Sequence, residues 1–442
     1  MSAAPAGSPL SRDRAALLDA MLGDLEELVV CESFSADLDA VARSAGVVAA
    51  QGTRLLGVPP ETIVIDGVTH LRWTFGTPRV LVLGHHDTVW PIGSLRTRPW
   101  SVTGGIARGP GVFDMKAGLV QAFHALTSLP SPDGVCLLVT GDEEVGSTTS
   151  RDLVEGAARR CSAAFVLEAA ADGGALKTAR KGTSNYEMVV HGRAAHAGLN
   201  PEKGANAAIE LAHQVLAIEG VAALVNGDGT AAPAGADGAR TPATATAPGT
   251  AGVPAVTGAG TTVTPTVLSA GTTANTVPAL ARVAVDVRSP TLAAQRRVDA
   301  LIRALPPRLA GTRLEVLGGP NRPPMEASSS AGLFALAQRV AADLGLDPLT
   351  GIGVGGGSDG NFTAGVGCPT LDGLGAVGGG AHAEDEHVVV AELPGRTALL
   401  AGLIRAVLAG DGPRGRKGTG SGTGSGGVDG GVDGGVDGTG PR

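Results

Sequence analysis

Three short runs of this sequence are apolar along almost their whole length. They cover Val80–Leu83, Val135–Thr140 and Phe165–Leu167. A strand with one solvated face alternates between apolar and polar side chains, whereas these runs do not alternate. They are typical of central strands that are covered on both faces. The sequence therefore predicts an α/β fold for this part of the chain.

Apolar residues at helical spacing indicate the helices that could cover such a sheet. One predicted helix runs from an N-cap at Ser11 through Val29, and a second covers Asp37–Leu56. A third covers Gln121–Leu129, between two of the predicted strands. A further capped helix is expected over SSSAGLFALAQRVAADLG, near the C-terminal end.

The pattern changes at about Lys181, which indicates a second, smaller α+β domain inserted into the first. There, SNYEMVVHGRA and residues 282–287 alternate as strands with one solvated face, and residues 206–216 have helical spacing. Low-complexity sequence at 226–260 predicts a loop, and the glycine-rich repeat after residue 410 predicts a disordered tail. The predicted segments are 1–180 and 321–409 for the main domain, 181–320 for the insert and 410–442 for the tail.

Composition excludes several classes of partner. The chain has 442 residues, enough for two domains, and a formal net charge of −8 without a basic run, which argues against nucleic acid or an anionic membrane as partner. No stretch approaches the roughly 18 consecutive apolar residues of a membrane span, and no secretory signal is recognisable. The four cysteines are far apart, so disulfides are not indicated. We expect a cytoplasmic protein.

The stretch VLVLGHHDTVWP places two histidines and an aspartate at the end of a predicted central strand. If the chain stays extended there, His85 and Asp87 point to the same side and His86 points away. A carboxylate beside an imidazole can fix its tautomer and strengthen it as a metal ligand. Taken alone, the pattern is equally compatible with a polar strand end that carries two solvent-exposed histidines.

Other potential metal ligands follow strands or lie in glycine-rich turns, where an α/β fold would bring them together. They are Asp114 in GPGVFDMKAG, Asp142, Glu143 and Glu144 in GDEEVGS, Glu168 in FVLEA and His382 in GGGAHAEDEH. Three carboxylates with two histidines suit zinc without any thiolate. GDEEVGS alone would indicate a solvated acidic turn, but its occurrence with the other groups favours a metal site.

The ordered set GHHDTV, GPGVFDMKAG, GDEEVGS, FVLE, GRAAHAG and GGGAHAEDE resembles the M20 metallopeptidase family, especially its glutamate carboxypeptidase-like branch. The resemblance extends from about Leu17 to Arg405. It implies a zinc-exopeptidase-like catalytic domain with a mixed central sheet flanked by helices. It also implies that the insert is a lid domain through which two chains form a homodimer.

The resemblance assigns roles to individual residues. Asp114 would bridge two zinc ions, for which cobalt or manganese could substitute, and its peptide bond to Met115 is expected to be cis. The implied ligands are His85 and Glu168 for one ion, and Glu144 and His382 for the other. Glu143 would be the general base, and Asp87 would orient His85.

Substrate contacts implied by the resemblance lie mainly in the insert. They are His196, acting on the oxyanion across the dimer interface, together with Asn275, Arg288, Gly357 and Ser358. Arg322 is a weaker candidate, and Tyr186, Lys177 and Lys181 are interpreted as structural or peripheral. The turn GIGVGGGSDG lacks the G-K-[ST] ending of a phosphate-binding loop, so nucleotide binding is not predicted.

The implied function is a dizinc metallohydrolase that releases a C-terminal amino acid, with glutamate as one candidate, from a peptide or N-acyl amino acid. An N-acyl amino-acid deacylase or desuccinylase, of the acetylornithine deacetylase or succinyl-diaminopimelate desuccinylase type, needs the same metals and base. A non-catalytic binding protein is a third hypothesis, although such a protein would be expected to have lost Glu143 or a ligand.

Overall fold

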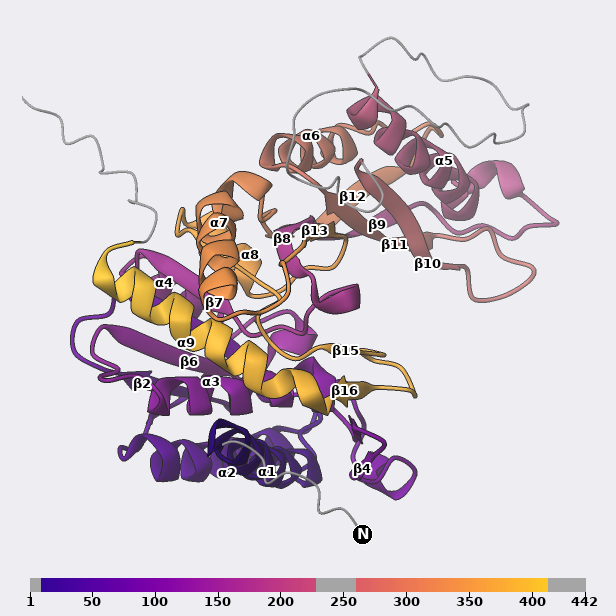
Figure 1. Ribbon diagram of the computed structural model, residues 1–442. Coiled ribbons are helices and arrows are strands. Elements are labelled where there is room, and N and C mark those ends of the chain that lie inside the picture. The colour runs from indigo at the N-terminus through magenta and orange to yellow at the C-terminus, as the bar shows by residue number, and fades with distance from the viewer. Residues whose placement is uncertain (1–8, 228–259, 412–442) are drawn as a thin grey trace, which may run out of the picture.

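The computed structural model describes residues 9–227 and 260–411, which form two units of different architecture (Figure 1). The larger unit contains a six-stranded sheet, and the smaller one contains a four-stranded sheet. The loop expected at 226–260 and the tail expected from residue 410 lie almost entirely outside the described residues.

The central sheet of the larger unit has the strand order β1-β2-β6-β3-β7-β14. These strands are β1 (Glu61–Ile65), β2 (Val68–Thr74), β6 (Val135–Thr140), β3 (Val80–His85), β7 (Ala163–Val166) and β14 (Thr370–Leu371). β3 is parallel to both β6 and β7, and β14 is parallel to β7, whereas β1 and β2 pair antiparallel. The predicted mixed sheet is confirmed, and the three predicted central strands are β3, β6 and β7.

Helices cover both faces of this sheet. They are α1 (Pro9–Val30), α2 (Leu38–Leu56), α3 (Ala117–Thr127), α7 (Ala327–Asp343) and α9 (Leu393–Ala409) on one face, and α4 (Arg151–Ala158) and α8 (Gly360–Gly365) on the other. Val82 of β3 packs into the cluster formed with the first group, and Leu83 packs into the cluster formed with the second. Because successive residues of a strand point to opposite faces, both must be apolar here, which explains why the runs do not alternate.

The helix boundaries agree with the predictions except at two N-termini and one C-terminus. The helix predicted at 206–216 is α5 (Ala207–Asn226), which extends ten residues beyond the predicted end. α2 begins after Asp37, whose side chain caps the helix by accepting a hydrogen bond from the Ala40 N–H. α1 begins at Pro9, so the prediction of Ser11 as its N-cap is wrong. Proline is tolerated in a first helical turn because the N–H that it lacks would have no partner there. α3 begins at Ala117, four residues earlier than predicted.

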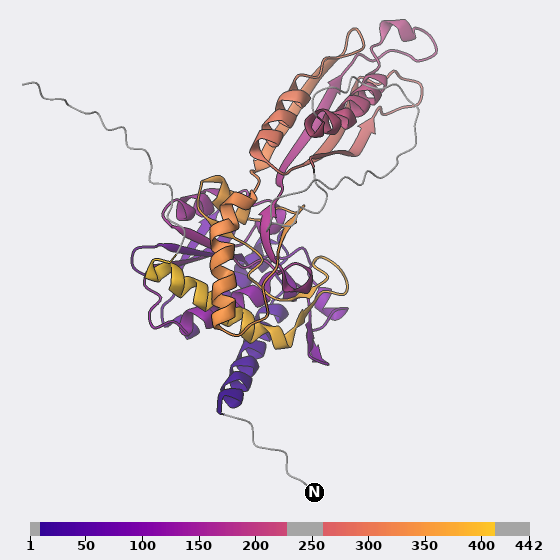
Figure 2. The same cartoon turned by 45° about the horizontal axis from the view of Figure 1, so that its top comes forward.

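The smaller unit is inserted between β8 (Leu176–Arg180) and α7 and has the predicted α+β composition. Its antiparallel sheet has the order β10-β11-β9-β12. The strands and helices are β9 (Gly182–His191), α5 (Ala207–Asn226), β10 (Thr262–Ala270), β11 (Leu280–Ser289), α6 (Leu292–Arg303) and β12 (Arg313–Arg322). Both helices pack on the sheet around side chains such as Met188 and Val285. Figure 2 shows this inserted unit projecting from the larger one.

α5 is long and apolar enough to span a membrane by length and composition alone, and it is the one helix of the described residues that meets this test. The same test is passed by helices that pack against the sheet of a globular domain. α5 buries Leu211, Ile218 and Val221 against the sheet of the inserted unit. The length and composition of α5 are therefore weak evidence for a membrane span.

Two small sheets complete the larger unit. β8 pairs with β13 (Gly351–Val354), and β15 (Gly378–Gly379), β16 (His387–Val389), β5 (Ile106–Arg108) and β4 (Ser101–Thr103) form a separate sheet. The second of these sheets positions the loop that carries His382, because that loop joins β15 to β16.

Candidate metal centre

The candidate site lies at the carboxyl ends of the parallel strands. His85 is the last residue of β3, and Glu168 follows the end of β7 by two residues. Glu143 and Glu144 lie in a short 3-10 turn, Glu143–Val145, that follows β6. Since parallel strands end at the same edge of a sheet, residues far apart in the sequence meet here.

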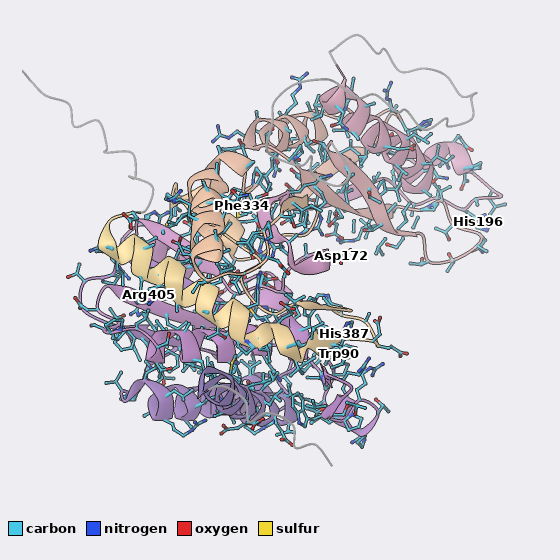
Figure 3. All side chains as sticks on the ribbon, in the orientation of Figure 1. Trp90, Asp172, His196, Phe334, His387 and Arg405 are labelled. Atoms are coloured by element: carbon cyan, nitrogen blue, oxygen red, sulfur yellow. The ribbon has the colours of Figure 1, made fainter. Side chains whose placement is uncertain are left out.

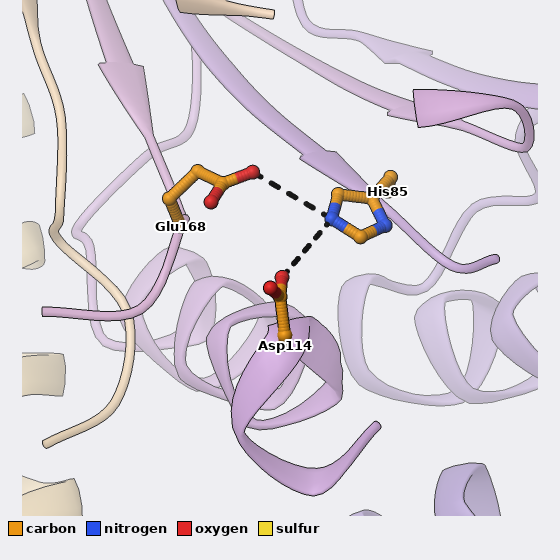
Figure 4. A group of neighbouring side chains, drawn as sticks. All are labelled: His85, Asp114 and Glu168. Atoms are coloured by element: carbon orange, nitrogen blue, oxygen red, sulfur yellow. Dashed lines mark ion pairs between the residues drawn. The ribbon is translucent and has the colours of Figure 1, made fainter. Parts of the chain in front are cut away.

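Asp114 is brought to this edge by the helical turn Val112–Lys116, directly before α3. Its peptide bond to Met115 is cis, as predicted. Asp114 lies against His85, with Oδ1 3.4 Å from Nε2 of the histidine. The same Nε2 is 3.6 Å from Oε1 of Glu168, so these three side chains form one potential ligand group (Figure 4).

A second potential ligand group contains Asp114, Glu144 and His382. Nε2 of His382 is 3.3 Å from Oδ2 of Asp114 and 3.1 Å from Oε2 of Glu144. Asp114 therefore presents a different oxygen to each group. The five residues predicted as ligands are brought together in the two predicted sets, with Asp114 shared between them.

Unsatisfied polar atoms support the interpretation that these groups suit metal ions. Among the described residues, the buried Nε2 of His85 and Oδ1 of Asp114 have no hydrogen-bond partner, which is costly unless another ligand satisfies them. Nδ1 of His85 lies 3.0 Å from the backbone oxygen of Asp87 and 3.4 Å from its Oδ1. A proton held on Nδ1 by these acceptors leaves the Nε2 lone pair free for a cation.

The charges in the site also favour cations. Burial would lower the pKa of His85, but the surrounding carboxylates raise it well above its ordinary value. Hydrogen bonding to Asp114 and Glu144 raises the pKa of His382 to about 10. Each group of carboxylates thus stabilises positive charge on the histidine that faces it. The same negative electrostatic potential would stabilise a bound divalent cation.

Asp87 connects the histidine to the acidic turn. It is fully buried, and its Oδ2 accepts a hydrogen bond of 2.7 Å from Oγ of Ser35. It also accepts backbone N–H bonds of 3.2 Å each from Glu143 and Glu144. Asp87 therefore contacts the imidazole of His85 and also holds the turn that carries Glu143, the general-base candidate. The sequence did not reveal this link between His85 and Glu143.

Glu143 belongs to neither ligand group, but it directly precedes Glu144 and interacts electrostatically with Glu168 and His85. Its side chain is largely buried, and Nη1 of Arg322 donates a hydrogen bond of 2.9 Å to its Oε1. Burial raises the pKa of Glu143 well above its ordinary value, although the guanidinium of Arg322 opposes this shift. A raised carboxyl pKa is what proton uptake near neutral pH requires.

His86 is not a ligand candidate, as the alternating geometry predicted. It is fully buried, and its Nε2 lies 3.0 Å from the backbone oxygen of Thr69. Burial lowers its pKa to about 4, so the ring is neutral at physiological pH. The alternative of a strand end with two solvent-exposed histidines is wrong, because His85 is buried too.

The predicted substrate contacts in the GIGVGGGSDG turn need one correction. Ser358 is fully buried and donates a 2.7 Å hydrogen bond to Oδ2 of Asp372, so its hydroxyl is not available to a substrate here. Gly357 is partly exposed and its carbonyl lies 3.4 Å from Nη1 of Arg180. Gly357 therefore stays a candidate, whereas Ser358 supports the network around Arg180.

The other predicted substrate contacts are not brought to the metal centre within one chain. His196 is exposed at the far end of the inserted unit, away from His387 and Trp90, which lie near the ligand loops (Figure 3). Asn275 is exposed on a neighbouring loop, where its backbone oxygen accepts the Ala197 N–H. Arg288 pairs with Asp286 of its own strand at 2.9 Å.

Lys177 is closer to the site than predicted, since its Nζ lies 3.9 Å from Oε2 of Glu168. The other two residues interpreted as structural or peripheral lie in the inserted unit or at its entrance. Tyr186 donates a 3.1 Å hydrogen bond to Asp299, and Lys181 donates one of 2.6 Å to the Gly260 oxygen.

Two buried charged networks that the sequence did not single out support the ligands. In one, Nη2 of Arg180 lies 3.3 Å from Oε2 of Glu168 while its Nε lies 2.6 Å from Asp372. In the other, Glu386 accepts hydrogen bonds from Nε1 of Trp90 at 2.6 Å and from the backbone N–H groups of Gly111, Phe113 and Asp114 at 2.9–3.1 Å. Nothing local in the sequence marks either network, because their members are far apart along the chain.

Replacing Glu386 with glutamine is expected to weaken metal binding by about 10- to 100-fold, the usual range for residues that orient ligands. The amide retains one acceptor oxygen and turns its NH₂ group toward N–H donors, which loosens the turn of Asp114. Calorimetric metal titration would measure the loss. Glu384→Gln is the matched control, because that side chain is 89% exposed and pairs with Arg98. Equal affinities of the two variants would contradict the role of Glu386.

Comparison with known proteins places this chain in a family. The sequence profile described as Peptidase family M20/M25/M40 matches residues 81–406. Carboxypeptidase G2 of Pseudomonas sp. (strain RS-16) is 26% identical over 416 residues, covering 88% of this chain and 90% of that protein. Succinyl-diaminopimelate desuccinylase of Rhodopseudomonas palustris (strain HaA2) is 25% identical over 372 residues, covering 78% and 87%.

Solved structures agree on the fold. An M20 family metallo-carboxypeptidase from Sulfolobus solfataricus superimposes with a TM-score of 0.65 at 17% identity, covering 88% of this chain and 98% of that one. The aminopeptidase PepT from Bacillus cereus gives a TM-score of 0.62 at 20% identity, covering 88% and 99%. The chain belongs to peptidase family M20/M25/M40, and it is a hydrolase of the metallopeptidase type.

Proposed function

We propose that this protein is a dinuclear metallohydrolase that cleaves an amide bond and releases a C-terminal amino acid from a peptide or an N-acyl amino acid. The observation that carries the proposal is the arrangement around Asp114, which offers Oδ1 to one ligand group and Oδ2 to another. Glu143 directly precedes Glu144 and can serve as the base. Zinc is the proposed metal because two imidazoles and three carboxylates suit it, with cobalt or manganese as substitutes.

The proposed mechanism uses Glu143 twice. Two divalent ions held by the ligand groups would polarise the scissile carbonyl and make a water molecule more acidic. Glu143 takes the proton from the attacking water and then transfers it to the leaving amine. Asp87 keeps Glu143 in place through the backbone N–H of the turn. His382 is half exposed, so the ligand group that contains it is open toward a substrate.

Substrate recognition is proposed to involve residues of the inserted unit. His196 of the partner subunit would donate to the oxyanion, and Asn275 would assist it. Arg288 would bind a substrate carboxylate, since its planar guanidinium matches a carboxylate with two parallel bonds. In the present structure that guanidinium makes such a pair with Asp286, which shows that its geometry permits it.

The runner-up function is an N-acyl amino-acid deacylase or desuccinylase. The similarity to a succinyl-diaminopimelate desuccinylase favours it, since this relative matches over most of its own length. The reaction would use the same ligands and the same base, so the metal centre does not separate the two functions. A non-catalytic binding protein is disfavoured, because both ligand groups and Glu143 are present.

A substrate panel with and without a chelator is the test of this proposal. We expect the metal-loaded protein to hydrolyse N-acyl-glutamates or dipeptides, and removal of metal to abolish turnover, with recovery on adding zinc, cobalt or manganese. Released amino acids would be quantified by chromatography. Strong preference for N-succinyl-diaminopimelate would favour the runner-up function. Turnover that is unchanged after complete chelation, verified by metal analysis, would contradict the metallohydrolase proposal itself.

We further propose a cytoplasmic homodimer that forms through the inserted unit. Large apolar side chains are exposed on adjacent elements of that unit, which favours an interface there. On α5, Ile209 is 51% and Leu216 is 68% exposed, and on the edge strand β10, Val267 is 68% and Leu268 is 53% exposed. A second chain covering this surface would also account for the distance of His196 from the metal centre of its own chain.

Val267→Asp is expected to convert the dimer into a monomer and to lower turnover at least about tenfold, because it places a charge in an apolar interface that brings in His196. Light scattering coupled to size-exclusion chromatography would report the mass. Leu317→Asp is the control, since Leu317 is 41% exposed on β12, the opposite edge of the same sheet. A wild-type monomer with full activity would contradict the proposal.

A further inference from the structure

The chain crosses between the two units at two neighbouring points. It enters the inserted unit at Gly182 and leaves it at Arg322, and β9 and β12 pair there through Thr183 and Arg322. Nδ2 of Asn361 donates hydrogen bonds to the backbone oxygens of both crossing segments, at 3.1 Å to Lys181 and 2.7 Å to Pro323. Arg322 therefore lies at the junction where β12 of the inserted unit connects to the larger unit.

The side chain of Arg322 reaches from this junction to the general-base candidate. Its Nη1 donates a 2.9 Å hydrogen bond to Oε1 of Glu143, and its Nη2 lies 3.2 Å from the backbone oxygen of the same residue. Nη2 also bonds to Oγ of Ser147 at 2.6 Å and to Oδ1 of Asp359 at 3.2 Å. The guanidinium thus forms hydrogen bonds to both ends of the acidic turn, residues 143–147, and to one carboxylate oxygen of Asp359.

Burial makes these contacts selective for one geometry. Arg322, Glu143 and Asp359 are each less than a tenth exposed, and the guanidinium also lies 5.2 Å from the ring centre of Phe362. A planar fork that satisfies several acceptors at once leaves little freedom to the carboxylate it holds. Asp359 alone could neutralise Arg322, so the additional bond to Oε1 indicates a role in placing Glu143.

We propose that Arg322 is a positioning residue for Glu143, anchoring one of its carboxylate oxygens so that the other faces the reacting water. Because Arg322 is the last residue of β12, its hydrogen bond to Glu143 also links the general base to the inserted unit. The inference rests on the proposed function in one respect, namely that Glu143 is the general base. A misplacement of a catalytic group by about 1 Å can cost a factor of about 100 in rate, which sets the expected effect.

The test compares Arg322→Met and Arg322→Lys with a matched arginine on the same ring. Arg151 lies 5.1 Å from the ring centre of Phe362 but pairs with Glu155. We expect Arg322→Met to lower kcat about 100-fold with KM within about threefold of wild type. Arg322→Lys should recover part of that loss, because an ammonium can reach one acceptor but not all of them. Arg151→Met should behave like wild type.

The Glu143→Gln background separates positioning from general support of the fold. If Arg322 acts through Glu143, adding Arg322→Met to Glu143→Gln should reduce the residual kcat by less than about threefold, because residues that act as a unit are not additive. Circular dichroism and metal content would show that the variants are folded and loaded. If Arg322→Met does not fold, the same comparison can be made between Arg322→Lys and the double variant Arg322→Lys with Glu143→Gln.

Two outcomes would overturn the inference alone. A rise in KM with unchanged kcat would make Arg322 a substrate contact, and an equal fold-loss in the wild-type and Glu143→Gln backgrounds would make its effect independent of the base. A wild-type protein that hydrolyses nothing in the substrate panel would overturn the proposed function, and this inference with it.

Discussion

Glu143→Gln is expected to lower kcat by about 10³-fold while both metal sites stay loaded. The amide cannot accept the proton of the attacking water, and general-base catalysis typically contributes about 10² to 10⁴ in rate. Metal content should persist because Glu143 belongs to neither ligand group. Steady-state kinetics together with elemental analysis of the purified variant would measure both quantities.

The control for this prediction is Glu155→Gln, a glutamate of the nearby helix α4 that pairs with Arg151 and Arg159 on the surface. It should keep wild-type activity. A Glu143→Gln protein that retains more than about a tenth of the wild-type kcat would require another base. Loss of metal from Glu143→Gln would instead show that the ligand sets are assigned incorrectly.

His85→Ala is expected to remove one metal ion per chain and nearly all activity. Its Nε2 faces Asp114 and Glu168, and alanine would leave these two carboxylates close together without their imidazole. His86→Ala should keep both ions, because that ring bonds to the Thr69 oxygen instead. It should nevertheless destabilise the fold by about 2 kcal/mol, since it removes a buried hydrogen-bonded side chain.

Elemental analysis and thermal unfolding of the two variants would separate these effects. The pair differs by one position in the sequence, so each variant controls for the other. Equal metal loss from both would contradict the alternation of side chains at the end of β3. Full metal content in His85→Ala would contradict its assignment as a ligand.

The three central strands β3, β6 and β7 of the larger unit could be predicted from the sequence because they are buried on both faces. β1 is largely exposed and has no such pattern. Val80–Leu83 has no polar alternation, and the structure places its successive side chains in two different apolar clusters. The start of α1 could not be predicted in the same way. A proline at Pro9 and a serine at Ser11 are both acceptable near a helix N-terminus, so local chemistry did not choose between them.

The individual ligand candidates were also accessible from the sequence, since each lies in a short motif at the end of a strand or in a glycine-rich turn, whereas their division into two groups came from the family resemblance. The contacts that position the ligands and the general-base candidate were not accessible from the sequence. Arg322 and Glu143 are 179 positions apart, and Glu386 and Gly111 are 275 positions apart. Such contacts depend on where the chain returns to the larger unit, and no local pattern encodes that. For the same reason the local pattern did not reveal that Ser358, implied by the resemblance as a substrate contact, is buried against Asp372.

The adjacency of the two crossing points has a consequence for how proteins of this architecture can diversify. All five ligand candidates and Glu143 lie outside residues 182–322, and the ends of this segment are neighbours in paired strands. A segment whose ends are close together can be exchanged as a cassette without rebuilding the surrounding domain. Recombination between relatives could therefore replace the unit proposed to bind the substrate in one step and leave the proposed hydrolytic centre intact, provided that the arginine at the boundary is kept.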